Sequence, residues 1–190
     1  MKKEIREINN NIKSDAESRT IEGYAVVFDS QSEDMGFREV IHRGAITEDT
    51  INDSDIFCKF NHDDSKVLAR SKNGKGSLLL EVDDKGVKYM LEAPRTELGN
   101  ETLEYLRRGD ITSSSFAFTV SPEKDAEKWH KEGDVLYRDI YKIDHLYDVS
   151  PVFNAAYAAT TCSARALEVL EESKKIDKEL DILAEEIDNL

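Results

Sequence analysis

The chain has 190 residues, with 40 acidic and 26 basic side chains and a formal net charge of −14. This length suits one sizeable core rather than two large domains. An acidic chain offers little to nucleic-acid phosphates, no apolar run approaches the roughly 20 residues of a membrane span, and the charged N-terminus carries no export signal. The two cysteines, Cys58 and Cys162, form no CxxC pair and fit a reducing compartment. We therefore expect a cytoplasmic protein that handles proteins or small molecules.

Short apolar runs bounded by turn residues predict most of the regular structure. The spacer Asp83-Asp84-Lys85-Gly86 predicts a hairpin between two of these runs, and a second hairpin closes near residues 130–134. The predicted strands are Ile21–Phe28, Asp55–Phe60, Gly76–Val82, Val87–Ala93, Ile111–Val120, a run from Val135 towards Ile143, and roughly His145–Phe153.

One internal helix is expected between the fourth and fifth of these strands. Thr96 suits its N-cap, Leu98, Leu103 and Leu106 form its apolar stripe, and Gly109 suits the position after its last turn. About seven or eight short strands with one helix predict a mixed α and β protein whose core is a mainly antiparallel barrel or sandwich. The absence of a strand–helix rhythm argues against a doubly wound parallel sheet.

The C-terminal segment differs in kind from the rest of the chain. Residues 164–190 carry nine acidic and four basic side chains and contain neither proline nor glycine. We therefore expect a domain over residues 1–163 and an acidic amphipathic helix over 164–190, which either packs on that domain, self-associates or leads into a further segment. Its apolar positions follow heptad spacing at Ile176, Leu180, Leu183, Ile187 and Leu190.

Three polar residues near strands could carry hydrolytic chemistry. His62 follows the predicted strand that ends at Phe60, where a rigid scaffold can present a side chain to a cleft. Strand alternation places Ser115 on the face opposite Phe116 and Phe118, among small residues. A solvated loop and a solvated sheet face are the plain alternatives for His62 and Ser115.

A serine hydroxyl becomes a nucleophile only when a base takes its proton, and the base needs an acceptor that fixes its tautomer. Asp148 is a carboxylate inside an otherwise apolar strand, where charges are rare without a partner. His145 lies three residues earlier and hence on the other strand face. Asp148 is therefore the better candidate.

Two rival chemistries have weaker support. His62, Asp63 and Asp64 could hold a metal with His42, but consecutive positions rarely converge on one ion and no HExxH spacing is present. Cys58 lies among apolar strand residues, where a free cysteine usually acts as a small hydrophobe. The sequence contains no GxSxG elbow, P-loop or GxGxxG motif.

Taken together, these segments resemble the prohead (procapsid maturation) serine proteases of tailed bacteriophages, the HK97-type group. Phe60-Asn61-His62-Asp63 resembles the motif that carries the catalytic histidine, and residues 108–118 resemble the motif of the nucleophile, with Ser115 at its place. Asp148 stands where the family more often has glutamate, and Ser113 and Ala117 stand where it has glycines. The other similar segments are Ile21–Phe28, Gly44–Ile46, Asp148–Val152 and Ala155–Tyr157.

The resemblance implies a serine endopeptidase with a herpesvirus-protease-like (assemblin-like) fold, in which Ser115 is the nucleophile, His62 the base and Asp148 the acid. It also implies a homo-oligomer, most simply a dimer, and no cofactor or metal. Its substrates would be the phage major capsid protein, a scaffold segment and the protease itself, inside the procapsid assembling in the bacterial host cytoplasm. The alternative is an inactive capsid-assembly or scaffolding factor with the same fold.

Overall fold

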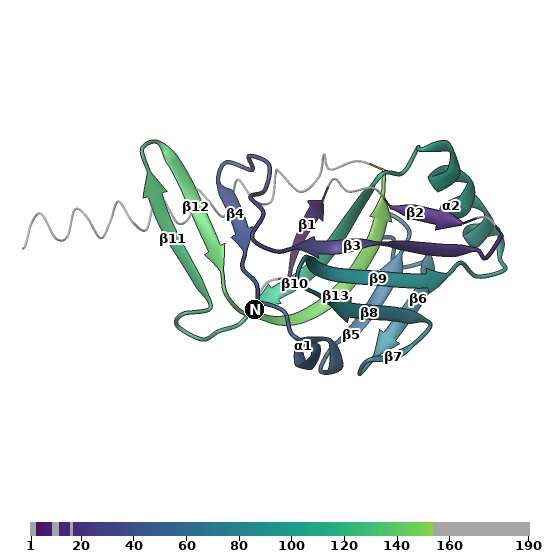
Figure 1. The fold of residues 1–190 in the computed structure, drawn as a ribbon, viewed down its shortest axis with the longest axis horizontal. Coiled ribbons are helices and arrows are strands. Elements are labelled where there is room, and N and C mark those ends of the chain that lie inside the picture. Colours follow the sequence, from purple (N-terminus) through teal and green to yellow (C-terminus); the bar gives the residue numbers. More distant parts are fainter. Residues whose placement is uncertain (1–2, 9–11, 16, 154–190) are drawn as a thin grey trace, which may run out of the picture.

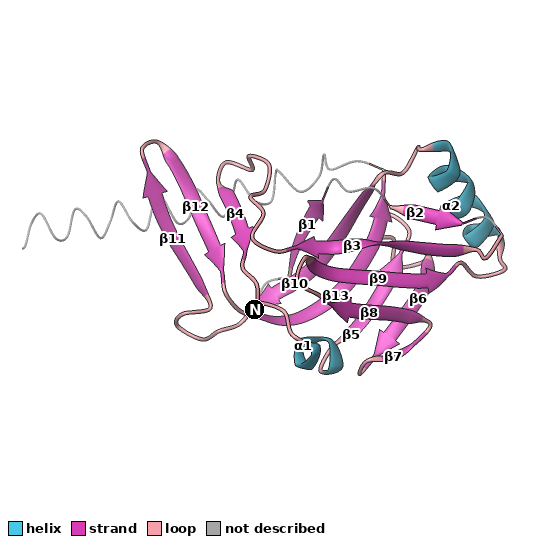
Figure 2. Cartoon of the chain, viewed as in Figure 1, coloured by secondary structure: helices cyan, strands magenta, loops and turns pink. Residues whose placement is uncertain are grey.

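A computed structural model describes residues 3–8, 12–15 and 17–153 of the chain. In this part the chain forms three β-sheets and two short helices (Figures 1 and 2). Neither helix is long and apolar enough to cross a membrane. The predicted helix over 164–190 lies outside the described residues.

The largest sheet has six strands and carries the candidate site. Its neighbouring strands pair antiparallel, except that β13 runs parallel to β5 through the pair Asp148 and Phe57. In order across the sheet, the strands are β1 (Glu4–Ile8), β10 (Ser113–Val120), β13 (Ile143–Val152), β5 (Asp55–Lys59), β6 (Val67–Lys72) and β7 (Lys75–Gly76).

A four-stranded antiparallel sheet packs on the first one and supplies part of the main core. Its strands, in order, are β2 (Lys13–Asp15), β3 (Thr20–Val27), β9 (Gly86–Glu92) and β8 (Leu78–Val82). Ile21 and Leu91 from this sheet share one buried cluster with Ile56, Phe116 and Phe118 from the six-stranded sheet. Burial of these apolar side chains is the main contribution to the free energy that holds the two sheets together.

A three-stranded sheet lies to one side of this core, at the left of Figure 1. It contains β11 (Glu127–Glu132), β12 (Val135–Ile140) and β4 (Arg38–Ile41), and β12 runs parallel to β4. Phe37 and Leu136 form a small cluster of their own beside Met35 and Trp129. This sheet therefore has a small apolar cluster of its own, while Ile41 of β4 and Ile140 of β12 join the main core.

The predicted internal helix is confirmed as α2 (Glu97–Arg108). Thr96 caps it by accepting a hydrogen bond from the backbone N–H of Gly99, and Gly109 ends it with φ +76°. Glycine takes this left-handed conformation without the steric penalty of a side chain. A second helix, α1 (Glu48–Asn52), is a single turn with Thr47 as its cap.

Most predicted strands are found within a few residues of their expected bounds. Of the two expected architectures, a barrel or a sandwich, the barrel is wrong. The described residues form three separate sheets and close no barrel. Two strand pairs are parallel, so the expectation of antiparallel pairing holds for most pairs but not all. The sequence prediction also missed α1, β1, β2, β4, β6 and β7.

The strand β1 was not predicted because its burial pattern is unusual. Glu4 and Arg6 are buried, whereas Ile5 between them is 39% exposed. The strand thus turns its charged residues inward, which reverses the usual alternation of apolar core and polar surface.

Candidate active site

Ser115 lies in the middle of β10, between two neighbouring strands. In the ladder it faces Glu7 of β1 on one side and Ser150 of β13 on the other. The expected alternation is confirmed, because Ser114 points the other way and bonds the Tyr89 hydroxyl at 2.9 Å inside the core. Both faces of β10 are buried, so the solvated-face alternative for Ser115 does not hold.

His62 is held by a tight turn that follows β5. The backbone N–H of Asp63 donates to the Phe60 carbonyl, and the N–H of Asn61 donates to the Pro151 carbonyl of β13. Asn61 and His62 adopt positive φ values of 52° and 60°. For non-glycine residues this conformation costs on the order of 1 kcal/mol or more each, a cost that clusters at functional sites.

The turn brings the imidazole of His62 between the other two predicted residues. Its Nε2 lies 2.5 Å from Ser115 Oγ, and its Nδ1 lies 3.1 Å from Asp148 Oδ1. Both contacts fall within hydrogen-bonding range. Residues far apart in sequence thus form a serine–histidine–aspartate arrangement with the order and spacing that acyl transfer requires.

Asp148 is almost fully buried and is surrounded by groups that favour its charged form. Burial alone would raise its pKa, but the hydrogen bond and charge of His62, the Ser150 hydroxyl and the Lys59 ammonium lower the pKa below its ordinary value. The carboxylate therefore stays ionised at neutral pH. It can fix the Nδ1–H tautomer of His62 and stabilise an imidazolium.

Lys59 and Ser150 are supporting residues that the sequence analysis missed. Lys59 Nζ lies 3.3 Å from Asp148 Oδ2 and 2.6 Å from Asp64 Oδ1, while the Ser150 hydroxyl donates to Asp148 Oδ1. Burial opposes the charge of Lys59, yet these two carboxylates raise its pKa. Ser150 could have been found from its position two residues after Asp148, on the same strand face.

Glu7 lies beside the site on β1 and was also missed. Burial raises its pKa, although a hydrogen bond with Ser113 and the charge of His62 partly offset this rise. A half-buried carboxylate opposite the candidate nucleophile indicates that β1 belongs to the surroundings of the site.

The rival cysteine has the surroundings of a structural residue. Cys58 is completely buried, and burial together with the charge of Asp148 raises the pKa of its thiol. A buried, protonated thiol is a poor nucleophile. Cys162 lies outside the described residues.

The other histidines are engaged elsewhere. His42 Nε2 lies 2.7 Å from Asp139 Oδ1, and its ring stacks on Tyr141, while His145 contacts Asp144. Within residues 3–8, 12–15 and 17–153, no three His, Cys, Asp or Glu side chains are grouped as a metal site would require. The structure therefore does not bring His42 to His62, Asp63 and Asp64 as that alternative needed.

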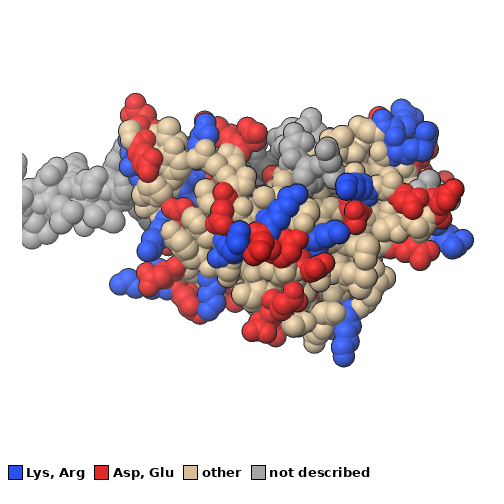
Figure 3. Space-filling model, viewed as in Figure 1, with Lys and Arg blue, Asp and Glu red and all other residues tan. Residues whose placement is uncertain are grey.

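On the face shown in Figure 3, acidic and basic side chains are interspersed, and no broad basic surface forms there.

Comparisons with known proteins give one family assignment. No curated protein matches the chain. Among solved structures, the bacteriophage T4 capsid assembly protease, gp21, aligns with a TM-score of 0.47 and 12% sequence identity, covering 80% of this chain and 96% of that chain. The family model described as "Caudovirus prohead serine protease" matches residues 4–175. Since this match spans most of the sequence, the chain belongs to the caudovirus prohead serine protease family.

Proposed function

We propose that this protein is a serine endopeptidase of phage procapsid maturation, with Ser115 as nucleophile, His62 as general base and Asp148 as the orienting acid. The observation that carries the proposal is the position of His62, whose two ring nitrogens face Ser115 Oγ and Asp148 Oδ1 at 2.5 and 3.1 Å. Family membership supports peptidase chemistry independently.

In the first half of the reaction, Asp148 accepts the Nδ1–H of His62, which leaves Nε2 as a proton acceptor. His62 takes the proton of Ser115 while Oγ attacks the scissile carbonyl carbon. The imidazolium that forms is stabilised by the ionised carboxylate of Asp148.

In the second half, His62 returns the proton to the leaving amine, and the C–N bond of the peptide breaks. A water molecule then loses a proton to Nε2 and attacks the acyl-enzyme, which releases the new carboxyl terminus and restores Ser115. Each proton transfer uses the same imidazole, so no cofactor or metal enters the proposed mechanism.

The proposed substrates are the major capsid protein of the phage, a scaffold segment and the protease chain itself. The proposed place of action is inside the procapsid that assembles in the host cytoplasm, and the proposed state is a homodimer. The HK97-type grouping and the herpesvirus-protease-like fold belong to this proposal as well.

The test is to incubate the purified chain with the capsid and scaffold proteins of its own phage and to measure intact masses. We expect discrete fragments with the wild type and none with Ser115→Ala. Ser114→Ala is the matched control, because it removes a buried hydroxyl from the neighbouring position of β10 without touching His62.

Cleavage by both the wild type and Ser115→Ala would place the nucleophile elsewhere. If neither cleaves when intact procapsids are supplied as substrate, the alternative of an inactive assembly factor replaces the peptidase.

A further inference from the structure

The strand β1 takes the edge of the six-stranded sheet directly beside the nucleophile strand. It pairs antiparallel with β10 from Glu4 opposite Phe118 to Ile8 opposite Ser114. An exposed strand edge offers a row of backbone N–H and C=O groups to which an extended peptide can add. In this structure the chain's own N-terminal strand fills that position.

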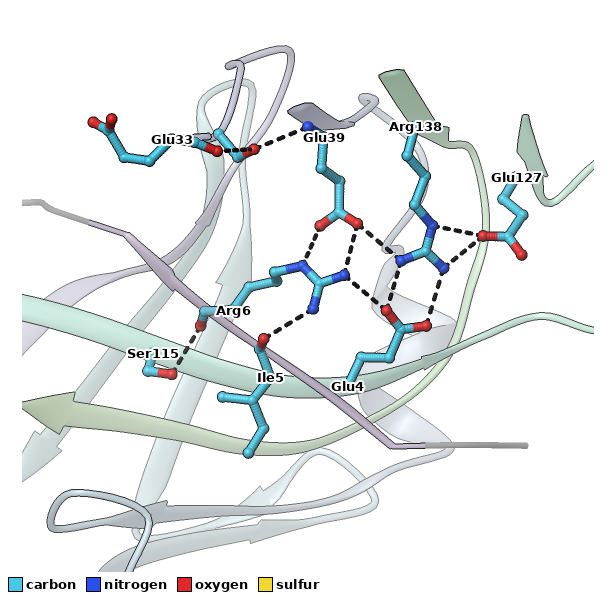
Figure 4. A network of polar contacts seen from close by, with 9 residues as sticks. Glu4, Ile5, Arg6, Glu33, Glu39, Ser115, Glu127 and Arg138 are labelled. Atoms are coloured by element: carbon cyan, nitrogen blue, oxygen red, sulfur yellow. Dashed lines mark hydrogen bonds and ion pairs between the residues drawn. The ribbon is translucent and has the colours of Figure 1, made fainter. Parts of the chain in front are cut away.

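β1 also contacts the nucleophile itself. Ser115 Oγ donates a hydrogen bond of 2.8 Å to the carbonyl oxygen of Arg6, and Ser115 is 1% exposed (Figure 4). A hydroxyl has one proton and can donate to only one acceptor at a time. While Ser115 donates to the Arg6 carbonyl, Nε2 of His62 cannot accept that proton.

The side chains of β1 hold it against the three-stranded sheet through ion pairs. Arg6 donates through Nε and Nη2 to both carboxylate oxygens of Glu39 at 2.6 and 2.8 Å. Glu4 accepts from Nη1 and Nη2 of Arg138 at 2.6 and 3.0 Å. Glu39 and Arg138 are themselves direct neighbours in the parallel pair of β4 and β12. Figure 4 shows the two pairs facing each other.

The contacts that hold β1 in place are mainly ion pairs rather than apolar contacts. Ile5 is 39% exposed, and of the β1 side chains only Ile8 is among those that pack against the main core. Release of β1 would uncover the polar groups that it now pairs, together with the Phe37 and Phe118 rings beneath the Arg6 guanidinium. It would leave Glu39 with one of its two arginine partners and Arg138 with two of its three carboxylate partners, and buried charges without full pairing are costly. Another strand with the same two charges would restore the pairing.

We propose that the edge of β10 occupied by β1 is the substrate-binding edge, so that β1 competes with substrate within the chain. Resting on the serine-peptidase function proposed above, this inference also specifies the substrate. It is an extended peptide with a carboxylate and a guanidinium two residues apart on one face, as Glu4 and Arg6 are arranged.

The first test measures how fast a fluorophosphonate probe labels Ser115 in the full-length chain. The Arg6→Ala variant removes the double contact to Glu39, so β1 leaves the edge more often and labelling is expected to accelerate about tenfold or more. Glu4→Gln keeps the shape of β1 and removes one charge, and a smaller rise is expected. Arg70→Ala, which breaks a double arginine–carboxylate contact with Asp55 on other strands of the sheet, is the matched control and should label at the wild-type rate.

The second test adds peptides to the full-length Arg6→Ala chain. A peptide with the sequence of residues 3–8, Lys-Glu-Ile-Arg-Glu-Ile, should slow the labelling of Ser115. The control peptide Lys-Arg-Ile-Glu-Glu-Ile has the same composition with the first glutamate and the arginine exchanged. It should inhibit about tenfold less, because each charge would face its like in Arg138 and Glu39.

These outcomes separate the two proposals. Equal labelling of the wild type, Arg6→Ala and Glu4→Gln, or equal inhibition by both peptides, overturns the role of β1 and leaves the peptidase intact. If Ser115 is labelled in none of the chains, the serine-peptidase function fails and the role of β1 falls with it.

Discussion

The hydroxyl of Ser150 donates a hydrogen bond to Oδ1 of Asp148, the same oxygen that faces Nδ1 of His62. Ser150 also accepts a hydrogen bond from the backbone N–H of Lys59, and so it links β13 to the strand that leads into the histidine turn. Its position allows it to orient the carboxylate and the imidazole together. Removal of a residue that orients a reacting group in this way can reduce activity by more than the energy of its own hydrogen bond would suggest.

Ser150→Ala should lower kcat/KM by about ten- to a hundredfold, since a hydrogen bond to a charged group contributes about 1.5–3 kcal/mol. Steady-state kinetics on a capsid-derived peptide measure the effect. Ser54→Ala is the matched control, because Ser54 is buried, bonds the Thr50 carbonyl and accepts from the N–H of Leu146, away from the site. An equal loss in both variants would show a purely structural role.

Asp148→Asn should preserve the fold and reduce kcat by a factor on the order of 10³ or more, because the amide cannot stabilise the imidazolium and favours the wrong tautomer of His62. Circular dichroism checks the fold and single-turnover kinetics check the rate. A turnover rate equal to that of the wild type would refute the assigned role of Asp148.

The acid stability of the protein should depend on Asp148. Its pKa is lower in the folded chain than the ordinary 3.8. The stabilisation from its ionised form is therefore complete above the unfolded pKa and is lost as the pH falls through the folded pKa. The difference in unfolding free energy between the wild type and Asp148→Asn should stay constant above about pH 5 and change in favour of the variant below it. Urea denaturation at several pH values measures this, and a difference that stays constant down to about pH 2 would contradict it.

Lys59→Met should raise the pH at which the protein loses the stabilisation from ionised Asp148. Removal of the ammonium 3.3 Å from Asp148 Oδ2 takes away one of the charges that lower the pKa of this carboxyl. Lys59→Arg keeps the charge and should keep the transition close to its wild-type position. The pH at which stability falls is the readout, and a simple packing defect would lower stability without moving that pH.

Cys58 should be chemically silent in the folded protein. In a Cys162→Ser background, iodoacetamide should neither label Cys58 nor inhibit peptide hydrolysis, because the thiol is buried and its pKa is raised. Mass spectrometry of the intact chain, before and after unfolding in urea, measures the labelling. Rapid loss of activity with labelling of Cys58 would revive the thiol alternative.

Much of the fold follows from local sequence patterns. The hairpin of β8 and β9, the hairpin of β11 and β12, and the helix between Thr96 and Gly109 are confirmed, because turn residues and helix caps act over a few neighbouring positions. The edge strand β1 was not predicted because it buries Glu4 and Arg6. This burial is favourable only in the presence of Glu39 and Arg138, which lie far away in the sequence.

For the candidate site as well, some features follow from the sequence and others depend on the tertiary structure. The sequence by itself determined which side chains are present, and the motifs around His62, Ser115 and Asp148 indicated their chemistry. Only the tertiary structure decided that a turn with two positive φ values brings the imidazole between serine and aspartate, and that β1 lies against Ser115, the proposed nucleophile. The physical reason is that hydrogen bonds and ion pairs between distant segments depend on sheet pairing, which local periodicity does not specify.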